Sequence, residues 1–439
     1  MRRRTASRGI ALLTLLAATA VVAAACSSSG SSSVDTTAAP SNGRATTGQT
    51  IPGDSATYQY LVFNGDGNNL DAYAPYPPLL HQRVNSAFGP DFPQTSNPKG
   101  RDINAQICFF PDGSNRFIAG EDTNQTKGVL QGWGIFQLSG DHLGNLSMTE
   151  RGKVVPTYQS ASDNAENYGC GFLKDGRVLT GDVGNQALGP ADGQLIEWFP
   201  PFEGTNPGKT GDGHWKKVSF CKLDVDIATA QSIYVDENDN IYIASARPSS
   251  EAGAAAQGVY KYSPPFPTND TAAGGCGKKD STGAPMATTV HREKVLAAGE
   301  HGMYYPSGIA RTPTGGFYVS SVATGVIDEY DKDWKFVRTI LQPPAGETIG
   351  TQSYSTGTPL GLGVGPDGTI FFADIGIVKD DKGNIGPGEH TGSLRRITFT
   401  NGKPNPPETM ITGLDYPDGI GIWLPSAGSG STTTTAAAN

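Results

Sequence analysis

One pattern recurs along this chain and constrains its fold more than any other feature. A short apolar strand is followed by a tight turn, often Asp-Gly, and then by a second strand rich in Ile, Tyr, Phe and Val. Turn chemistry and alternation predict a β-hairpin for each copy. The copies are ICFFPDGSNRFIAGED (107–122), GFLKDGRVLTGD (171–182), IYVDENDNIYIAS (233–245), IARTPTGGFYVSS (309–321) and LGVGPDGTIFFAD (362–374).

Third and fourth strands follow most of these hairpins. Third strands are expected at 69–78, 195–204, 259–268, 326–334 and 394–402, and weaker fourth strands at 80–85, 215–223, 291–298 and 335–341. Units of four strands, repeated about every 53–76 residues, are typical of a β-propeller. The sequence therefore predicts an all-β fold of four-stranded blades.

The two ends of the domain decide how the ring closes. Residues 419–425, GIGIWLP, form a sixth first strand that has no second strand after it. Residues 58–85 supply a second, a third and a fourth strand that have no first strand. Together they predict one split blade that ties the ring shut, which gives a six-bladed propeller.

The N-terminus has the features of a bacterial export signal. Arg2, Arg3 and Arg4 precede an apolar stretch over 10–25, which is short for a membrane span and ends in small residues. Cys26 follows directly, and AAAC at 23–26 resembles a lipobox. That resemblance implies cleavage before Cys26, lipidation of its thiol, and a place on the outer face of the bacterial cytoplasmic membrane. A plain secretory signal with an incidental cysteine is the alternative.

Composition divides the chain into four segments. We assign residues 1–25 to the signal peptide, 26–54 to a lipid-anchored Ser/Thr-rich linker, 55–425 to the propeller and 426–439 to a disordered tail. Four of the 33 basic residues lie in 1–25, so the mature chain would carry 29 basic against 42 acidic residues, a net charge of −13. This charge argues against nucleic acid as a partner. A small molecule, a glycan or a protein at the top face remains as the expected partner.

Four cysteines remain after Cys26, and an oxidising compartment favours their pairing. Cys108 and Cys170 lie on the first strands of neighbouring blades, at offsets of opposite parity from their turns, so their side chains face one another. This predicts a Cys108–Cys170 disulfide, and Cys221 would then pair with Cys276. Other pairings, or free thiols, are the alternatives.

Two segments carry a family resemblance. YPSGIARTPTGGFYVSSVATGVIDEYDKDWKFVRTI (305–340) resembles an NHL repeat, and LGVGPDGTIFFADIG (362–376) with YPDGIGI (416–422) resembles the gluconolactonase–regucalcin family of six-bladed propellers. The resemblance implies a divalent metal, often calcium, at the top of the central channel. It also implies that its ligands are the middle residues of tripeptides that open each first strand.

In this chain those middle residues are Ala105, Tyr168, Gln231, Ser307, Leu360 and Asp418. Asp418 alone is acidic, and it is the first candidate for the metal ligand and for a catalytic role. Asn104, Asn167, Gln231 and Ser307 could add neutral oxygens, which calcium tolerates. The alternative for each is a structural role, as a turn residue or a hydrogen-bonding strand end.

His301, in GEHGMYY, precedes a first strand and is the second catalytic candidate, since its pKa suits acid–base work. The alternative is an ordinary surface-loop histidine. Two functions follow. One is a binding or scaffold module, and the other is a metal-dependent lactonase or esterase that resembles gluconolactonases. A seven-bladed, lyase-like propeller is a distant third, because only six first strands are present.

Overall fold

The computed structural model describes most of residues 60–424, and everything described is strand, turn or loop. The described ranges are 60–66, 69–75, 82–86, 102–122, 132–139, 147–154, 167–182, 193–202, 218–227, 230–246, 257–281 and 283–424. The signal segment, Cys26, the linker and the C-terminal tail lie outside them. Within these ranges no helix is long and apolar enough to cross a membrane.

Six sheets of four or more strands form the blades of a propeller, as the sequence predicts. Blade 1 is β30 (Ile420–Trp423), β1 (Leu61–Asp66), β2 (Asn69–Ala74) and β3 (Gln82–Ser86). Blade 2 is β4 (Asp102–Phe109), β5 (Arg116–Asp122), β6 (Gly132–Ser139) and β7 (Ser147–Val154). Blade 3 is β8 (Asn167–Phe172), β9 (Val178–Asp182), β10 (Gly193–Trp198) and β11 (Phe220–Ile227).

The other three blades follow in chain order. Blade 4 is β12 (Ala230–Val235), β13 (Ile241–Ser245), β14 (Gly258–Ser263) and β17 (His291–Ala297). Blade 5 is β18 (Pro306–Arg311), β19 (Phe317–Ser321), β20 (Val326–Tyr330) and β21 (Phe336–Leu341). Blade 6 is β22 (Pro359–Val364), β23 (Ile370–Asp374), β26 (Gly392–Ile397) and β29 (Glu408–Leu414).

Four short strands form two small hairpins, and two more join a blade. The hairpins are β24 (Ile377–Lys379) with β25 (Ile385–Pro387), and β27 (Phe399–Thr400) with β28 (Lys403–Pro404). β15 (Lys278–Lys279) and β16 (Pro285–Met286) lie in the insertion between β14 and β17. β16 pairs in parallel with β11, so the insertion from blade 4 extends the outer edge of blade 3.

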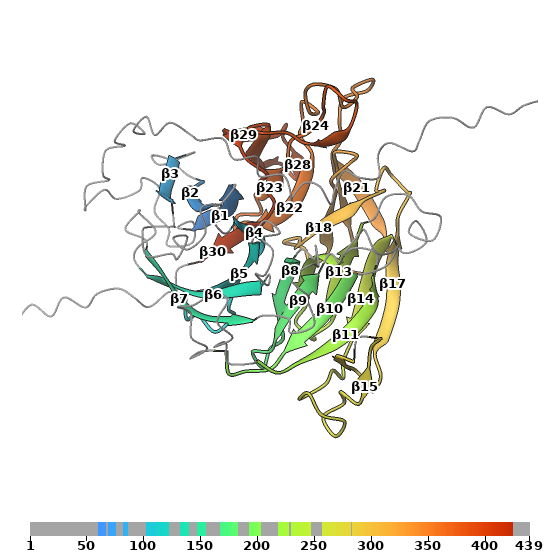
Figure 1. Ribbon diagram of the computed structural model, residues 1–439. Helices are drawn as coiled ribbons and strands as arrows, with labels where there is room; N and C mark the ends of the chain where they lie inside the picture. Colours follow the sequence, from blue (N-terminus) through green and yellow to red (C-terminus); the bar gives the residue numbers. More distant parts are fainter. Residues whose placement is uncertain are drawn as a thin grey trace, which may run out of the picture.

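The split blade closes the ring, which confirms the prediction made from the two chain ends. β1 and β30 are antiparallel neighbours, with Leu61 opposite Trp423 and Asn64 opposite Ile420. The inner strands contact one another in the order β30, β4, β8, β12, β18, β22 and back to β30. In Figure 1 the labelled inner strands gather near the middle, and the outer strands β3, β7, β17 and β29 lie at the periphery.

Glycines let neighbouring inner strands approach closely. A Cβ added at Gly419 would lie 1.6 Å from the carbonyl oxygen of Ala105, and one at Gly361 would lie 2.3 Å from that of Asp418. No side chain fits at such distances without moving the backbone. Glycine at the third position of these two tripeptides is therefore required by the tight packing at the centre of the propeller.

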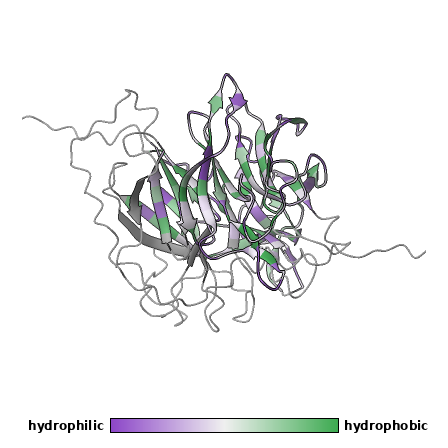
Figure 2. Cartoon of the chain, turned by 90° about the horizontal axis from the view of Figure 1, so that it is seen from above, coloured by the Kyte–Doolittle hydropathy of each residue, from purple (hydrophilic) through white to green (hydrophobic). Residues whose placement is uncertain are grey.

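The core lies between the blades, since each sheet buries both faces against its neighbours. Phe63 of blade 1 packs edge-on against Phe109 of blade 2 at 5.4 Å between ring centroids, and Phe117 stacks on Phe136 at 5.2 Å. Hydrophobic residues are frequent along the strands (Figure 2). The burial of both faces explains why the strands are so rich in aromatic and β-branched residues.

Two disulfides are present, in the pairing that the sequence predicts. Cys108 is bonded to Cys170 between the inner strands of blades 2 and 3, and Cys221 is bonded to Cys276 between β11 and the insertion. Lys222, beside Cys221, forms a buried ion pair with Asp280 of the same insertion. The insertion is thus fixed to blade 3 by a covalent bond, an ion pair and strand pairing.

Candidate functional site

The expected metal site lies at the mouth, which we define as the end of the ring where the inner strands begin. The six middle residues of the opening tripeptides are all buried there, at 4 % exposure or less. Burial to this degree means that their side chains are used in contacts between strands. The opposite end, which carries the hairpin turns between first and second strands, is called the turn face below.

Asp418 joins the inner strands of three blades. The Ala105 N–H donates to Asp418 Oδ2 at 2.6 Å, and the Tyr168 hydroxyl donates to the Asp418 carbonyl oxygen at 3.0 Å. Since Ala105 lies in blade 2 and Tyr168 in blade 3, these bonds tie both blades to the split blade 1. The carboxylate therefore has a structural role, as the alternative interpretation of the sequence expected.

Of the other predicted ligands, Ser307 and Gln231 have side chains that the structure describes. Ser307 Oγ lies 3.1 Å from Ser320 Oγ, within its own blade. Gln231 is buried, and its Oε1 has no hydrogen-bond partner among the described residues. Asn104 and Asn167 lie in β4 and β8, and their side chains are outside the described part of the structure.

Gln106 was not singled out from the sequence, yet it organises the interior of the ring. Its Oε1 accepts hydrogen bonds from the Cys170 N–H at 3.1 Å and from the Ile233 N–H at 2.9 Å. Its Nε2 donates to the Ile233 carbonyl oxygen at 2.9 Å. One side chain thus links the inner strands of blades 2, 3 and 4. Its place directly after a tripeptide's middle residue was the available signal.

An apolar cluster forms beside these tripeptides. Tyr168 and Leu360, both middle residues, pack with Val322, Ile375 and Ile377. The last two belong to the segment that leads into the β24–β25 hairpin. Tyr168 and Leu360 thus occupy, with apolar packing, two positions at which the family resemblance implies oxygen ligands.

Asp374 holds the segment that carries Ile375. It is 1 % exposed and accepts hydrogen bonds from the Thr358 N–H at 2.7 Å, the Gly376 N–H at 3.1 Å and the Ser393 hydroxyl at 2.7 Å. Arg395 lies 3.0 Å from its Oδ2. Asp374 ends the second strand of blade 6. Its hydrogen bonds hold Thr358, just before β22, and Gly376, just after β23.

These residues do not fit a calcium ion. Calcium takes six to eight oxygen ligands, with several carboxylates in its tighter sites. Ala105 and Leu360 have no ligand atom, and the Tyr168 hydroxyl and one Asp418 oxygen are engaged in bonds between strands. Among the described residues, no group of three or more His, Cys, Asp or Glu side chains is placed to hold a metal.

The His301 side chain packs on an outer strand. Its ring stacks on Phe336, in the outer strand β21, at 3.6 Å between centroids and 7° between planes. His301 and its two flanking turn glycines, Gly299 and Gly302, all have positive φ. This tight turn directs the side chain outward across blade 5 rather than toward the channel.

A cleft of about 620 Å³ opens on the turn face between blades 2 and 3. Apolar rings form one part of its lining: Phe110, Pro111, Pro200, Pro201 and Phe202. The remainder is polar or without a side chain: Asp112, Arg116, Lys174, Asp175 and Gly176. Its volume falls within the range of small-ligand sites, about 300–1,000 Å³.

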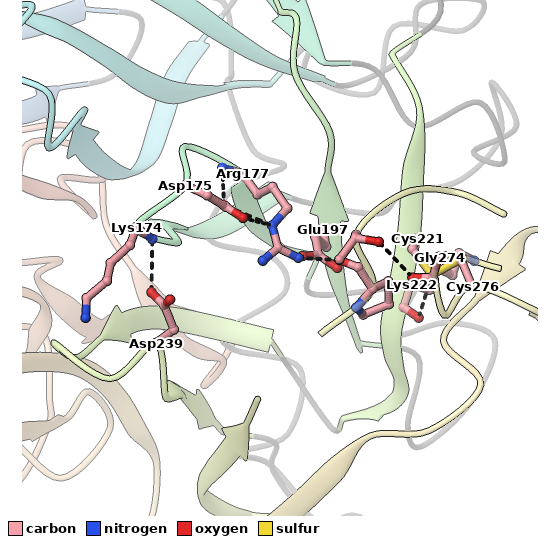
Figure 3. A network of polar contacts seen from close by, with 11 residues as sticks. Lys174, Asp175, Arg177, Glu197, Cys221, Lys222, Asp239, Gly274 and Cys276 are labelled. Carbon is pink, nitrogen blue, oxygen red and sulfur yellow. Dashed lines mark hydrogen bonds and ion pairs between the residues drawn. A yellow bond between two sulfur atoms is a disulfide. The ribbon is translucent and has the colours of Figure 1, made fainter. Parts of the chain in front are cut away.

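Charged side chains around the cleft are held in fixed orientations. Asp112 Oδ1 accepts the Ser114 N–H at 2.9 Å, and its Oδ2 pairs with Arg116 at 2.6 Å. The Arg116 guanidinium lies over the Phe110 ring at 4.6 Å. On the other wall, Arg177 lies between Asp175, at 2.8 Å, and the buried Glu197 (Figure 3).

Comparisons with known proteins agree with this architecture only in outline. No family model and no curated protein matches the sequence. Among solved structures, a luciferin-regenerating enzyme is 13 % identical, over 79 % of this chain and 90 % of that one, with a TM-score of 0.45. A calcium-binding regucalcin from Agrobacterium tumefaciens is 12 % identical, over 64 % and 84 %, with a TM-score of 0.35. Virginiamycin B lyase from Staphylococcus aureus is 12 % identical, over 72 % and 87 %, with a TM-score of 0.36.

The chain is a six-bladed β-propeller by its own sheet topology, and a regucalcin is among its structural neighbours. Identities this low tell nothing about its chemistry, because one propeller fold carries many activities. The arrangement of its own residues decides what it can do. The mouth offers packing and hydrogen bonds between strands, and the turn face offers an accessible cleft with oriented polar groups.

Proposed function

We propose that this chain is a binding module, held on the outer face of the bacterial cytoplasmic membrane by lipid on Cys26. One observation carries the binding role: Ala105, Tyr168 and Asp418, at three of the six metal-ligand positions, hydrogen-bond to one another across blades 1, 2 and 3. Asp418, the single carboxylate among them, accepts a backbone N–H of the next blade at 2.6 Å. A hydrolase that relied on a metal at this place would need its oxygens to be directed at the ion.

Thermal unfolding in the presence of calcium, together with a lactone assay, tests this role. An ion that binds only the folded state raises Tm by mass action. We expect no rise in Tm up to about 20 mM calcium, beyond the range of weak extracellular sites, and no hydrolysis of a small aldonolactone. A calcium-dependent rise in Tm that Asp418→Asn removes, with lactone hydrolysis that follows it, would instead establish the metal-dependent lactonase.

The anchor rests on the sequence around Cys26 and needs its own test. Cys26→Ser should move the protein from the membrane fraction to the medium, or leave it as unprocessed precursor. Mass spectrometry of the N-terminal peptide would detect the lipid in the parent chain. A fully processed Cys26→Ser product that stays in the membrane would contradict the proposal.

A further inference from the structure

Between the described turns of blades 2 and 3, which flank the cleft on the turn face, a hydrogen bond that joins the turns of blades 3 and 4 is missing. At the junction of blades 3 and 4, the Lys174 N–H donates to Asp239 Oδ1 at 2.9 Å, so the two turns are joined (Figure 3). Arg177 adds a hydrogen bond to the Pro267 carbonyl oxygen of blade 4. These contacts link the turns of neighbouring blades directly.

The junction of blades 2 and 3 is formed by two turns of the same kind, but it has neither the N–H donor nor the carboxylate acceptor of this hydrogen bond. Pro111 occupies in the turn of blade 2 the position that Lys174 occupies in the turn of blade 3, and it has no N–H to donate. Gly176 occupies in the turn of blade 3 the position that Asp239 occupies in the turn of blade 4, and it has no carboxylate to accept a hydrogen bond. Both Gly176 and Asp239 have positive φ, at +86° and +60°, as their equivalent places in the two turns require. A Cβ added at Gly176 would meet nothing within 4 Å.

The groups around this opening are already oriented for a ligand. Burial raises the pKa of Asp112, but hydrogen bonds from Ser114 and Arg116 outweigh it and lower the pKa overall. The same balance, with Arg177 as the donor, lowers the pKa of Asp175. Both carboxylates are therefore ionised acceptors at neutral pH, and their side chains are 45 % and 56 % exposed. Groups fixed in advance lose little entropy on binding.

The charge around the cleft selects among ligands. Among the described residues, two acidic and two basic side chains line it, so this part of the lining carries no net charge for an ion to neutralise. The strongly acidic mature chain also disfavours anions. A neutral ligand is left, with one apolar face for the exposed proline rings and with hydroxyl groups for Asp112, Asp175 and Arg116.

From this combination we infer that the cleft between blades 2 and 3 binds a neutral saccharide unit. The C–H face of the sugar ring would lie on the exposed rings of Pro111, Pro200 and Pro201. Its hydroxyls would donate to the two carboxylates and accept from Arg116. The inference deepens the proposed binding role and rests on it.

Saturation-transfer NMR with maltose, cellobiose and lactose tests the inference on the mature chain. We expect saturable binding of at least one of these neutral disaccharides in the millimolar range, and weaker binding of the anionic sialyllactose than of lactose. Gly176→Asp fills the opening and tolerates the positive φ, so it should lower the affinity at least about tenfold. Asp112→Asn should lower it by roughly threefold to tenfold.

Gly346→Asp is the matched control, since Gly346 also has a positive φ, +87°, and open space around its Cβ position. It lies after β21, away from the cleft, and should leave the affinity unchanged. Three results would overturn the inference: no saturable binding of any of the three sugars up to about 50 mM, sialyllactose bound as tightly as lactose, or Gly176→Asp binding like the parent chain. The lactone and calcium assays judge the binding role separately, so failure of one is distinguishable from failure of the other.

Discussion

The mouth and the turn face use polar residues in opposite ways. At the mouth, Asp418 is buried and, like the partly buried Gln106, satisfies backbone groups of neighbouring inner strands. At the turn face, Asp112 and Asp175 are fixed by their own turns, yet each keeps about half of its side chain exposed. Polar residues near the axis therefore hold this propeller together, and those at the hairpin turns are available for recognition.

The largest expected effect comes from opening the ring on which both faces depend. Deleting residues 417–426 removes β30 and leaves β1 as an exposed sheet edge, with the faces of two blades uncovered. We expect loss of cooperative thermal unfolding and aggregation of the product. A monomeric truncation with a sharp melting transition would show that closure is not required for either face.

The buried network beneath the turn face should make stability depend on pH. Burial raises the pKa of Glu197 to about 8, which outweighs the lowering by Arg177. The folded state then binds a proton that the unfolded state releases near pH 4.5, so this contribution is full below pH 4.5 and is lost as pH rises to 8. In the parent chain, this group should lower the free energy of unfolding by roughly 2–4 kcal/mol between pH 5 and pH 8. We expect Glu197→Gln to abolish that decline. Denaturant unfolding at pH 5 and pH 8 measures it, and equal slopes in the two proteins would contradict the assignment.

At the mouth, removal of the Asp418 carboxylate should destabilise the fold without affecting any metal. Asp418→Ala leaves the buried Ala105 N–H without its acceptor, which should cost about 1–3 kcal/mol. Chemical denaturation measures the loss, with Asp381→Ala in the exposed turn between β24 and β25 as a comparison. A variant as stable as the parent chain would mean that the carboxylate is not a contact between blades.

The smallest effect should come from removing the hydrogen bond between the turns of blades 3 and 4, so that this junction resembles the one between blades 2 and 3. Asp239→Gly removes the acceptor of the Lys174 N–H while keeping the positive φ. Since this hydrogen bond lies at the surface, we expect a loss of only about 0.5–1 kcal/mol. Denaturant unfolding that shows no loss at all would indicate that the two junctions differ in shape alone.

The repeats by themselves determined the architecture. Alternating strands around short turns, the unpaired strand at 419–425 and the unmatched strands at 58–85 required a ring of six blades with one split blade. The parity of Cys108 and Cys170 required that they face each other, because side chains on a strand alternate strictly between its faces. These features are local or periodic, so the sequence displays them directly.

Tertiary structure decided what the polar residues do. Asp418 is a good calcium ligand by chemistry, but its carboxylate meets the N–H of Ala105, a residue 313 positions away in the chain. His301 precedes an inner strand, yet three positive φ values in its turn direct it to β21. The cleft depends on Pro111 and Gly176 lying opposite each other on two blades, and neither residue alone indicates an opening. Contacts between distant segments arise only when the ring closes, and no spacing along the chain encodes them.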